Sequence, residues 1–283
     1  MEDKLIDLHT HTTFSDGELS PEELINLAIQ SNVGTLAITD HNTTNGLKGL
    51  DKERYKDQIR IIDGIELSAE WNTGRMHILG YGIDPYSVVL NDKMKEQESY
   101  SINKVMTIIE QLKRDYGITF SKEDFINIVN AKHSIGRPDI ATLCIKYGYA
   151  KNEDEAFDRY LNPAYKKTKK FNKRLSYEEC FDIIKKSGGI PTLAHPITLG
   201  LSEGPFLGLI KDMKSCGLEA IEVYHSNQDE EERNFYLNAA MQNDLLVSGG
   251  SDFHGPNKKP SIKIGTGKDN LNIKELSLVR KLK

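Results

Sequence analysis

Seven short and nearly continuous hydrophobic runs are spaced along the chain. Their apolar residues do not alternate with polar ones, and this pattern is typical of strands that are buried on both faces. We expect strands in the segments 4–8, 34–40, 59–67, 76–83, 189–195, 218–225 and 244–252. A sheet covered by helices on both faces would bury strands of this kind.

Helix-start signals lie between several of these segments. In "SPEELINLAIQ", Ser20 is in the N-cap position, Pro21 opens the helix and Glu23 completes a capping box. In "SYEECFDIIKKSGG", Ser176 and Glu179 repeat the same arrangement. Strands that alternate with helices predict a parallel α/β sheet or barrel.

The middle of the chain has a different pattern, with helical periodicity and no convincing strands between residues 98 and 174. Its first helix is predicted from a stripe with a 3.6-residue period, formed by Ile102, Val105, Met106, Ile109 and Leu112. Further helices are expected at 121–130, 138–147 and 152–161. We therefore predict a barrel domain made of residues 1–97 and 175–283, with a helical insertion domain at 98–174.

Composition and charge exclude several classes of protein. The 283 residues are 38% hydrophobic and 28% charged, and no apolar run approaches the ~20 residues of a membrane helix. The net charge of −5 would repel a polyanion at long range, which disfavours a general nucleic-acid-coating role. The three cysteines are far apart and odd in number, which argues against a disulfide framework. Because no secretory signal precedes the first strand, we expect a cytoplasmic protein.

One segment departs from this acidic average. Residues 164–174, "AYKKTKKFNKR", contain six basic residues and no acidic one. Such a run is most often a solvated surface. Together with the aromatic residues Tyr165 and Phe171, it could instead attract the phosphates and bases of a nucleotide or an RNA end. The sequence leaves both interpretations open.

Most histidines stand at or just after the end of a predicted strand. These are His9, His11, His41, His195, His225 and His254, whereas His77 lies inside the fourth strand segment and His133 in the predicted insertion. The acidic residues in their neighbourhood are Asp16, Asp40, Glu66 and Asp252. In a parallel barrel the carboxyl ends of the strands converge on one face, and that face carries the chemistry. Side chains scattered over the whole sequence could thus meet in one pocket.

Clustered imidazoles and carboxylates indicate a metal site. Any one histidine is more often a structural imidazole, but bringing many such groups together without a cation would cost free energy. Nitrogen and oxygen ligands without cysteine fit zinc, manganese or iron(II) better than magnesium or calcium. Because the candidate ligands are more numerous than one ion can use, we predict two or three divalent ions.

Six segments of the chain resemble the motifs of one known family. In chain order they are "DLHTHTTFSDG", "ITDHNT", "GIELSAEW", "MHILGYGID", "TLAHP" and "GGSDFHG". As a set they are similar to the motifs of the polymerase-and-histidinol-phosphatase (PHP) family of metal-dependent phosphoesterases. The resemblance covers residues 1–95 and 175–260.

This resemblance implies a distorted seven-stranded (β/α) barrel with three metal ions at the carboxyl ends of the strands. The implied ligands are His9, His11, Glu66 and Asp252 for one ion, Glu66 as a bridge with His77 and His195 for a second, and Asp16, His41 and His254 for a third. Asp7 and Asp40 each lie close to a ligand histidine and are interpreted not as direct ligands but as structural acids or as acids that fix the tautomers of imidazoles.

The inserted segment indicates the class of substrate. "GRPDIATLCIKYGY" and "AFDRYL" resemble the insertion of the PHP subfamily that includes 3',5'-nucleoside bisphosphate phosphatases and 5'-to-3' exoribonucleases of short RNA. The resemblance implies that Arg137 binds a substrate phosphate, for which a planar fork of donors is suited, whereas the alternative is a helix-start arginine that faces water. The family often has histidine where this chain has Asp139. His225 is a candidate phosphate contact or leaving-group acid, or alternatively a structural imidazole.

Three functions are compared on these grounds. The first is a metal-dependent phosphoesterase that uses metal-activated water on 3',5'-nucleoside bisphosphates or the 5' ends of short RNA. The second is a phosphatase for another small phosphomonoester, such as histidinol phosphate. The third is a non-catalytic metal-binding scaffold or a polymerase-associated module. The intact ligand set and the inserted segment favour the first function, which requires no membrane and no stable protein partner.

Overall fold

The computed structural model describes residues 3–131, 135–168 and 174–282, which fall into two compact units. The first unit comprises Met1–Asp92 and Leu175–Lys283, and the second comprises Lys93–Arg174. The sequence placed the first boundary five residues later, between residues 97 and 98. That the two units are separate domains stays a prediction.

Seven strands form one sheet in the first unit, in chain order. They are β1 (Leu5–Asp7), β2 (Val33–Ile38), β3 (Arg60–Ala69), β4 (Met76–Tyr81), β5 (Ile190–Leu193), β6 (Ala220–His225) and β7 (Leu246–Gly250). Each strand overlaps one predicted segment, but the sheet is not wholly parallel, because β4 runs antiparallel to both β3 and β5. The β3–β4 connection, residues 70–75, is too short for the crossover that a parallel pair requires.

The sheet closes almost completely on itself. Beyond the end of β1, the backbone N–H of Leu8 donates to the carbonyl of Gly249 at 3.1 Å, and the N–H of Asp252 donates to the carbonyl of His9 at 2.9 Å. These bonds join the first strand to the last. The predicted distorted seven-stranded barrel is thus confirmed.

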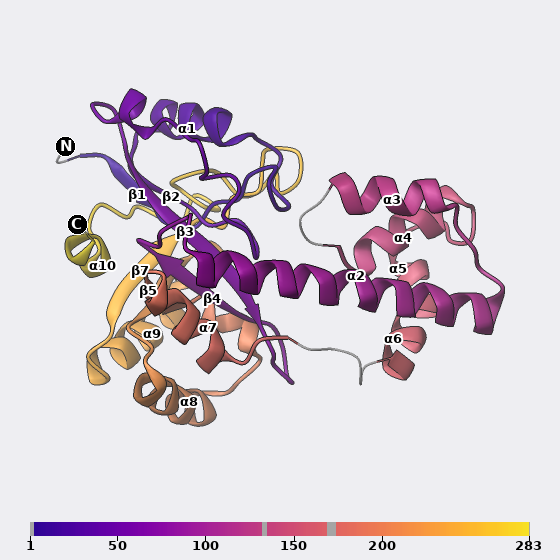
Figure 1. Ribbon diagram of the computed structural model, residues 1–283. Coiled ribbons are helices and arrows are strands. Elements are labelled where there is room, and N and C mark those ends of the chain that lie inside the picture. Colours follow the sequence, from indigo (N-terminus) through magenta and orange to yellow (C-terminus); the bar gives the residue numbers. More distant parts are fainter. Residues whose placement is uncertain (1–2, 132–134, 169–173, 283) are drawn as a thin grey trace. The chain divides into compact units, whose positions relative to one another are not determined.

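Five helices pack around this barrel (Figure 1). They are α1 (Pro21–Gln30), α7 (Tyr177–Lys186), α8 (Glu203–Cys216), α9 (Glu230–Gln242) and α10 (Ser277–Lys281). The predicted capping boxes open two of them, since Ser20 exchanges hydrogen bonds with Glu23, and Ser176 with Glu179. Two single-turn helices, η1 (Lys52–Tyr55) and η4 (Pro196–Leu199), follow β2 and β5.

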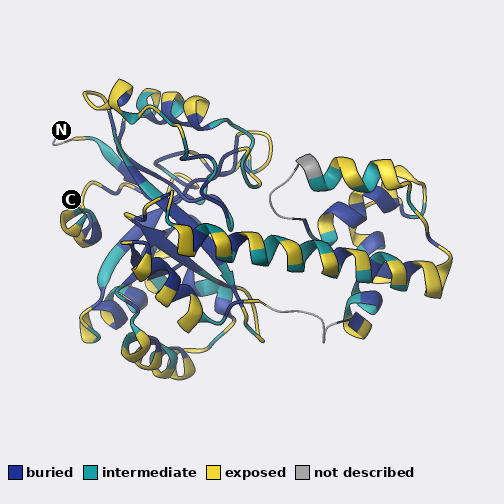
Figure 2. Cartoon of the chain, in the orientation of Figure 1, coloured by how far each residue is buried: buried dark blue, intermediate teal, exposed yellow. Residues whose placement is uncertain are grey.

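The interior of the barrel is apolar below its upper rim. Leu8, Tyr81 and Ala220 are fully buried in this core, and the C-terminal segment adds Leu278 to it. The strands are accordingly coloured mainly as buried in Figure 2. This packing fixes the strand ends on which the polar side chains stand. No helix in the described ranges combines the length and the hydrophobicity needed to cross a membrane.

The second unit is helical throughout its described residues. It contains most of α2 (Val88–Tyr116), then α3 (Lys122–Ala131), α4 (Arg137–Lys146), α5 (Glu153–Ala156), the π-helical turn η2 (Phe157–Leu161) and α6 (Asn162–Thr168). The predicted helices of the insertion are confirmed. In the stripe on α2, Val105 and Leu112 are buried as expected, but Met106 is 46% exposed and Ile108 is buried in its place.

Candidate metal centre

The upper end of the barrel gathers all nine predicted ligands and His225. They are His9 and His11 after β1, Asp16 in the following loop, His41 after β2, Glu66 in β3, His77 at the start of β4, His195 after β5, His225 at the end of β6, and Asp252 and His254 after β7. Because β4 is antiparallel, its start lies at the same end as the carboxyl ends of its neighbours. Most of these side chains line a cavity of about 530 Å³. His9 and His11 lie beneath it and are completely buried.

Glu66 stands at the middle of the cluster, and its two carboxylate oxygens face different imidazoles. Oε1 lies 2.8 Å from Nδ1 of His77 and 2.8 Å from Nε2 of His195. Oε2 lies 3.2 Å from one ring nitrogen each of His9, His11 and His41. A carboxylate in this position could bridge two ions, one on each side.

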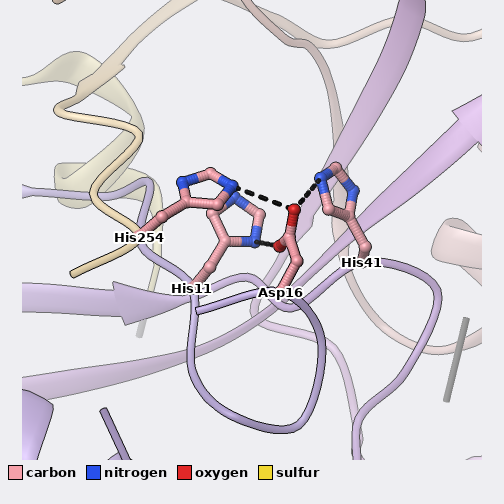
Figure 3. A group of neighbouring side chains, drawn as sticks. All are labelled: His11, Asp16, His41 and His254. Carbon is pink, nitrogen blue, oxygen red and sulfur yellow. Dashed lines mark ion pairs between the residues drawn. The ribbon is translucent and has the colours of Figure 1, made fainter. Parts of the chain in front are cut away.

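A second carboxylate lies among three histidines (Figure 3). Asp16 Oδ2 is 3.3 Å from His254 Nε2 and 4.0 Å from His41 Nε2, and Oδ1 is 3.8 Å from His11 Nδ1. These four residues offer ligand atoms that all lie within 4.8 Å of one another. The residues that the sequence assigned to a third ion are therefore adjacent, with His11 beside them.

Asp252 connects these groups. Its Oδ1 lies 3.3 Å from His11 Nε2 and 3.4 Å from His254 Nδ1, while Oδ2 accepts a 2.8 Å contact from Lys259 Nζ. Asp252 has a φ of 58° and His195 a φ of 22°, in the region that favours glycine. Such backbone conformations cost free energy and are concentrated at functional sites.

Several atoms of the cluster are suited to an ion rather than to a protein partner. The buried atoms that make no hydrogen bond within the described part of the chain include His9 Nε2, His11 Nδ1, His11 Nε2, His41 Nδ1 and Glu66 Oε2. An unpaired buried polar atom costs about 1–3 kcal/mol, so such a concentration of them calls for a ligand. The donor set fits divalent ions with nitrogen and oxygen preferences.

The charges of the cluster are strongly coupled. Burial lowers the pKa of His41 to about 3, even though Glu66 opposes this. Burial also disfavours the charged form of His11, but the neighbouring carboxylates of Asp252 and Glu66 outweigh it and raise its pKa to about 9. Burial would raise the pKa of Glu66, yet the histidines around it hold that pKa well below its usual value. Divalent ions would replace the protons that balance these carboxylates.

Glu222 contacts two of the candidate ligands and was missed by the sequence analysis. It is completely buried in β6, its Oε1 lies 2.8 Å from His9 Nδ1, and its Oε2 accepts a 2.6 Å hydrogen bond from the backbone N–H of His195. The contact to Nδ1 leaves Nε2 of His9 directed at the cluster. An acid inside the apolar run "LEAIEVYH" was the signal that could have revealed it.

Asp7 and Asp40 are structural acids, as one part of the prediction had it, but their hydrogen bonds in the described residues do not go to imidazole rings, so the predicted fixing of tautomers was wrong. Asp7 accepts hydrogen bonds from the backbone N–H groups of His9, Ser251 and Gly265 and from the Ser251 hydroxyl. Asp40 accepts from Thr12 and Ser15 in the loop after β1. Both acids bind backbone and hydroxyl donors because the loops that leave the strands turn back toward them.

The remaining predicted residues have different surroundings. His225 is buried beside Asp252, and its Nδ1 accepts a 3.1 Å hydrogen bond from the backbone N–H of Asn227. Arg137 is partly buried in the second unit, over the rings of Tyr165 (4.3 Å) and Phe157 (5.5 Å). It therefore does not simply face water.

The other features of the insertion are only partly visible. Asp139 accepts a hydrogen bond from the Gly136 N–H and caps α4. In the basic run, Lys167 forms an ion pair with Asp115 at 2.7 Å. His133, Lys169, Lys170, Phe171 and Lys173 lie outside the described residues.

Comparisons with known proteins show the family of the chain. The family profile of the PHP domain matches residues 7–162. The chain is 33% identical over 255 residues to the 5'-3' exoribonuclease Rnm of Salmonella typhimurium, covering 89% of this chain and 86% of the relative. It is 29% identical over 251 residues to the 3',5'-nucleoside bisphosphate phosphatase of Chromobacterium violaceum, covering 89% and 87%. A solved structure from Bifidobacterium adolescentis, described as a metal-dependent phosphoesterase, is 26% identical with a TM-score of 0.71 and covers 99% and 95%.

Proposed function

The chain belongs to the PHP domain family and is a metal-dependent phosphoester hydrolase, and from this premise we propose that it acts on phosphate esters of nucleotides. The proposed substrates are 3',5'-nucleoside bisphosphates, the 5' ends of short RNA, or both. Two relatives that match most of the chain are named for these activities. The observation that carries the proposal is the cluster of nine histidine and carboxylate side chains with unpaired buried atoms.

We assign the predicted ligands to two or three divalent ions, which we propose to be manganese, zinc or iron. His9, His11, Glu66 and Asp252 would hold one ion, Glu66 with His77 and His195 a second, and Asp16 with His41 and His254 a third. When bound, such ions supply an activated water nucleophile and neutralise the oxygens of a phosphate. Glu222 keeps His9 in the tautomer with its proton on Nδ1, so that Nε2 offers its lone pair.

His225 has a different proposed role. Because its Nδ1 accepts a hydrogen bond from Asn227, the proton of the neutral ring is on Nε2, which makes no hydrogen bond to the described residues and lies 3.7 Å from Asp252. A ring nitrogen that carries a proton is no metal ligand, but it can donate to a phosphate oxygen. This favours a phosphate contact over a leaving-group acid, which would need a second proton on Nδ1.

Arg137 is proposed to bind a phosphate of the substrate. One edge of its guanidinium donates to Asn162 Oδ1 at 3.0 Å, and Tyr165 lies against its plane. This support holds the fork in one orientation and leaves further donors for an anion. Lys104 lies over the same Tyr165 ring at 4.9 Å, which adds a second positive charge.

The test is a substrate comparison with the full chain. Metal-free protein is loaded with Mn²⁺, and phosphate release is measured from 3',5'-bisphosphoadenosine and histidinol phosphate, together with mononucleotide release from a 5'-phosphorylated RNA trinucleotide. Hydrolysis of the bisphosphate or the RNA, absent in His9→Ala, is the expected result. Activity confined to histidinol phosphate would replace the proposal with the second function. Metal binding without hydrolysis of any of the three would favour a scaffold.

A further inference from the structure

Positive side chains line the cavity in addition to the proposed metal ligands. Arg75 stands on the connection between β3 and β4, and Lys258, Lys259 and Lys268 stand on the segment after β7. Arg75, Lys258 and Lys268 are exposed. They therefore contribute to the part of the cavity that is open to solvent, in an acidic chain with a net charge of −5.

The segment that carries the three lysines is held firmly on the barrel. Residues 255–268 contain four lysines and no acid. Ile262 and Ile264 are buried beneath it, the Gly265 N–H donates to the buried carboxylate of Asp7, and Lys263 and Gly267 exchange two backbone hydrogen bonds of 2.8 Å. The positions of the lysines along the cavity are thus built into the fold.

These cations differ in how their charge is balanced. Lys259 forms an ion pair with Asp252, one of the proposed ligands. Lys258 Nζ donates only to the backbone carbonyl of Asp16, and the side chains of Arg75 and Lys268 make no hydrogen bond or ion pair within the described ranges. The carboxylate of Glu18 also interacts with the charge of Lys258, whereas Arg75 and Lys268 have no carboxylate partner among the described residues. Unbalanced cations beside a cavity attract an anion and guide it inward.

We propose that Arg75, Lys258 and Lys268 bind a phosphate group of the substrate other than the one that is hydrolysed. The hydrolysed phosphate is balanced by the metal ions, so it does not require these side chains. A second phosphate on the substrate does require positive side chains to balance it, and Lys and Arg are the usual partners of phosphate groups. This inference rests on the proposed function and deepens it, because it makes the preference for a second phosphate a property of the barrel unit itself.

The test compares a substrate with two phosphates and one with a single phosphate. For the wild type and for Arg75→Met and Lys268→Met, kcat/KM is measured on 3',5'-bisphosphoadenosine and on p-nitrophenyl phosphate. The ratio between the two substrates should fall about tenfold in each variant, the equivalent of one charge-assisted hydrogen bond. The same ratio is also measured with a 5'-phosphorylated RNA trinucleotide in place of the bisphosphate. The second phosphate is a phosphomonoester in the bisphosphate and a backbone phosphodiester in the RNA, so the two ratios distinguish these two sources.

The matched control is Lys263→Met. Lys263 belongs to the same segment, but it pairs with Asp269 at 2.8 Å and does not line the cavity. Its ratio should remain within about twofold of the wild type, since surface ion pairs contribute little. An unchanged ratio in Arg75→Met and Lys268→Met, or an equal fall in Lys263→Met, would overturn the inference.

Failure of the inference can be told apart from failure of the proposed function. If the enzyme hydrolyses p-nitrophenyl phosphate but neither nucleotide, the proposed function fails. The bisphosphate is then used as a competitor of p-nitrophenyl phosphate. A competitive inhibition constant that rises about tenfold in Lys268→Met would still support the second-phosphate site, and one that does not change would reject it.

Discussion

Two polar clusters in this chain are built on opposite principles. The barrel cluster places the carboxylates of Asp16, Glu66 and Asp252 among histidines and leaves buried ring nitrogens without a hydrogen-bond partner in the described residues. In the second unit, Arg137 and Lys104 lie over one tyrosine ring, and neither forms an ion pair with a carboxylate within the described residues. The first arrangement is suited to cations and the second to anions.

The proposed function gives the two clusters different tasks, the binding of metal ions in the barrel and the binding of a phosphate in the insertion. Burial in the barrel is tolerable because ions would balance the carboxylates. The second cluster keeps its charges only partly buried, where a phosphate can reach them. Changes in the two clusters should therefore affect different quantities: metal content in the barrel, and substrate affinity in the insertion.

The largest effect is expected for Glu66→Gln. The substitution keeps the shape of the side chain but removes the charge shared by five imidazoles, so the protein should lose bound metal and about 10³-fold in kcat. Metal content by elemental analysis and the rate on 3',5'-bisphosphoadenosine measure both. Full metal content with an unaltered rate would remove Glu66 from the centre.

His225→Asn should lower kcat by about 100-fold, as expected for the loss of one donor to a phosphate oxygen in a dry site. Metal content should remain that of the wild type, because the proposed tautomer of His225 carries its proton on Nε2 and would not ligate an ion. The same two measurements separate His225 from the ligands. A parallel loss of metal would make it a ligand after all.

Glu222→Gln should weaken metal affinity by about 10–100-fold, because the tautomer of His9 is no longer fixed. A titration with Mn²⁺ measures the affinity, and activity should recover at saturating metal. Glu231→Gln, an exposed acid on α9, is the matched control and should change neither quantity. An affinity equal to that of the wild type would show that Glu222 has only a structural role.

Arg137→Met should raise KM for the nucleotide substrate about tenfold with metal content unchanged. Arg159→Met is the matched control, since Arg159 also lies over a tyrosine ring, at 5.1 Å from that of Tyr160, but is 63% exposed. Steady-state kinetics of both variants measure the difference. Equal KM values in Arg137→Met and the wild type would leave Arg137 with a purely structural role.

The smallest effect concerns stability. Burial, together with the charges of Arg174 and Arg137, lowers the pKa of Lys104 to about 8. The folded state therefore disfavours the charged form, and this penalty is fully present below the pKa of the folded state and disappears as the pH rises toward the pKa of the unfolded chain. Lys104→Met should thus melt at a higher temperature than the wild type at pH 7, and the difference should shrink toward pH 10. A lower melting temperature at pH 7 would contradict this.

The two clusters also differ in how far the sequence predicted them. The candidate ligands of the barrel lie at strand ends and within short sequence motifs. Local patterns therefore place His9, His41 and Asp252 at one end of the sheet. Glu222 was missed because it lies inside an apolar strand, where only the three-dimensional register brings it next to His9. The direction of β4 likewise depends on pairing, which the hydrophobic pattern does not encode.

In the insertion, helix periodicity predicted the elements but not their contacts. Successive positions on a helix differ by about 100°, so Ile108, which follows Val105 by three residues and precedes Leu112 by four, lies on the buried face, whereas Met106 lies on nearly the opposite side. The stacking of Arg137 on Tyr165 joins residues 28 positions apart and depends on how α4 and α6 pack. Such contacts require the tertiary structure.

The central claim is that the barrel cluster holds divalent ions that make the chain a phosphoester hydrolase. The most direct measurement is phosphate release from 3',5'-bisphosphoadenosine by metal-free protein as Mn²⁺ is added, with the bound ions counted in the same samples. We expect no activity without metal and a rise in rate that follows the binding of two or three ions per chain. Equal rates with and without metal, or no bound metal at saturating concentrations, would contradict the account.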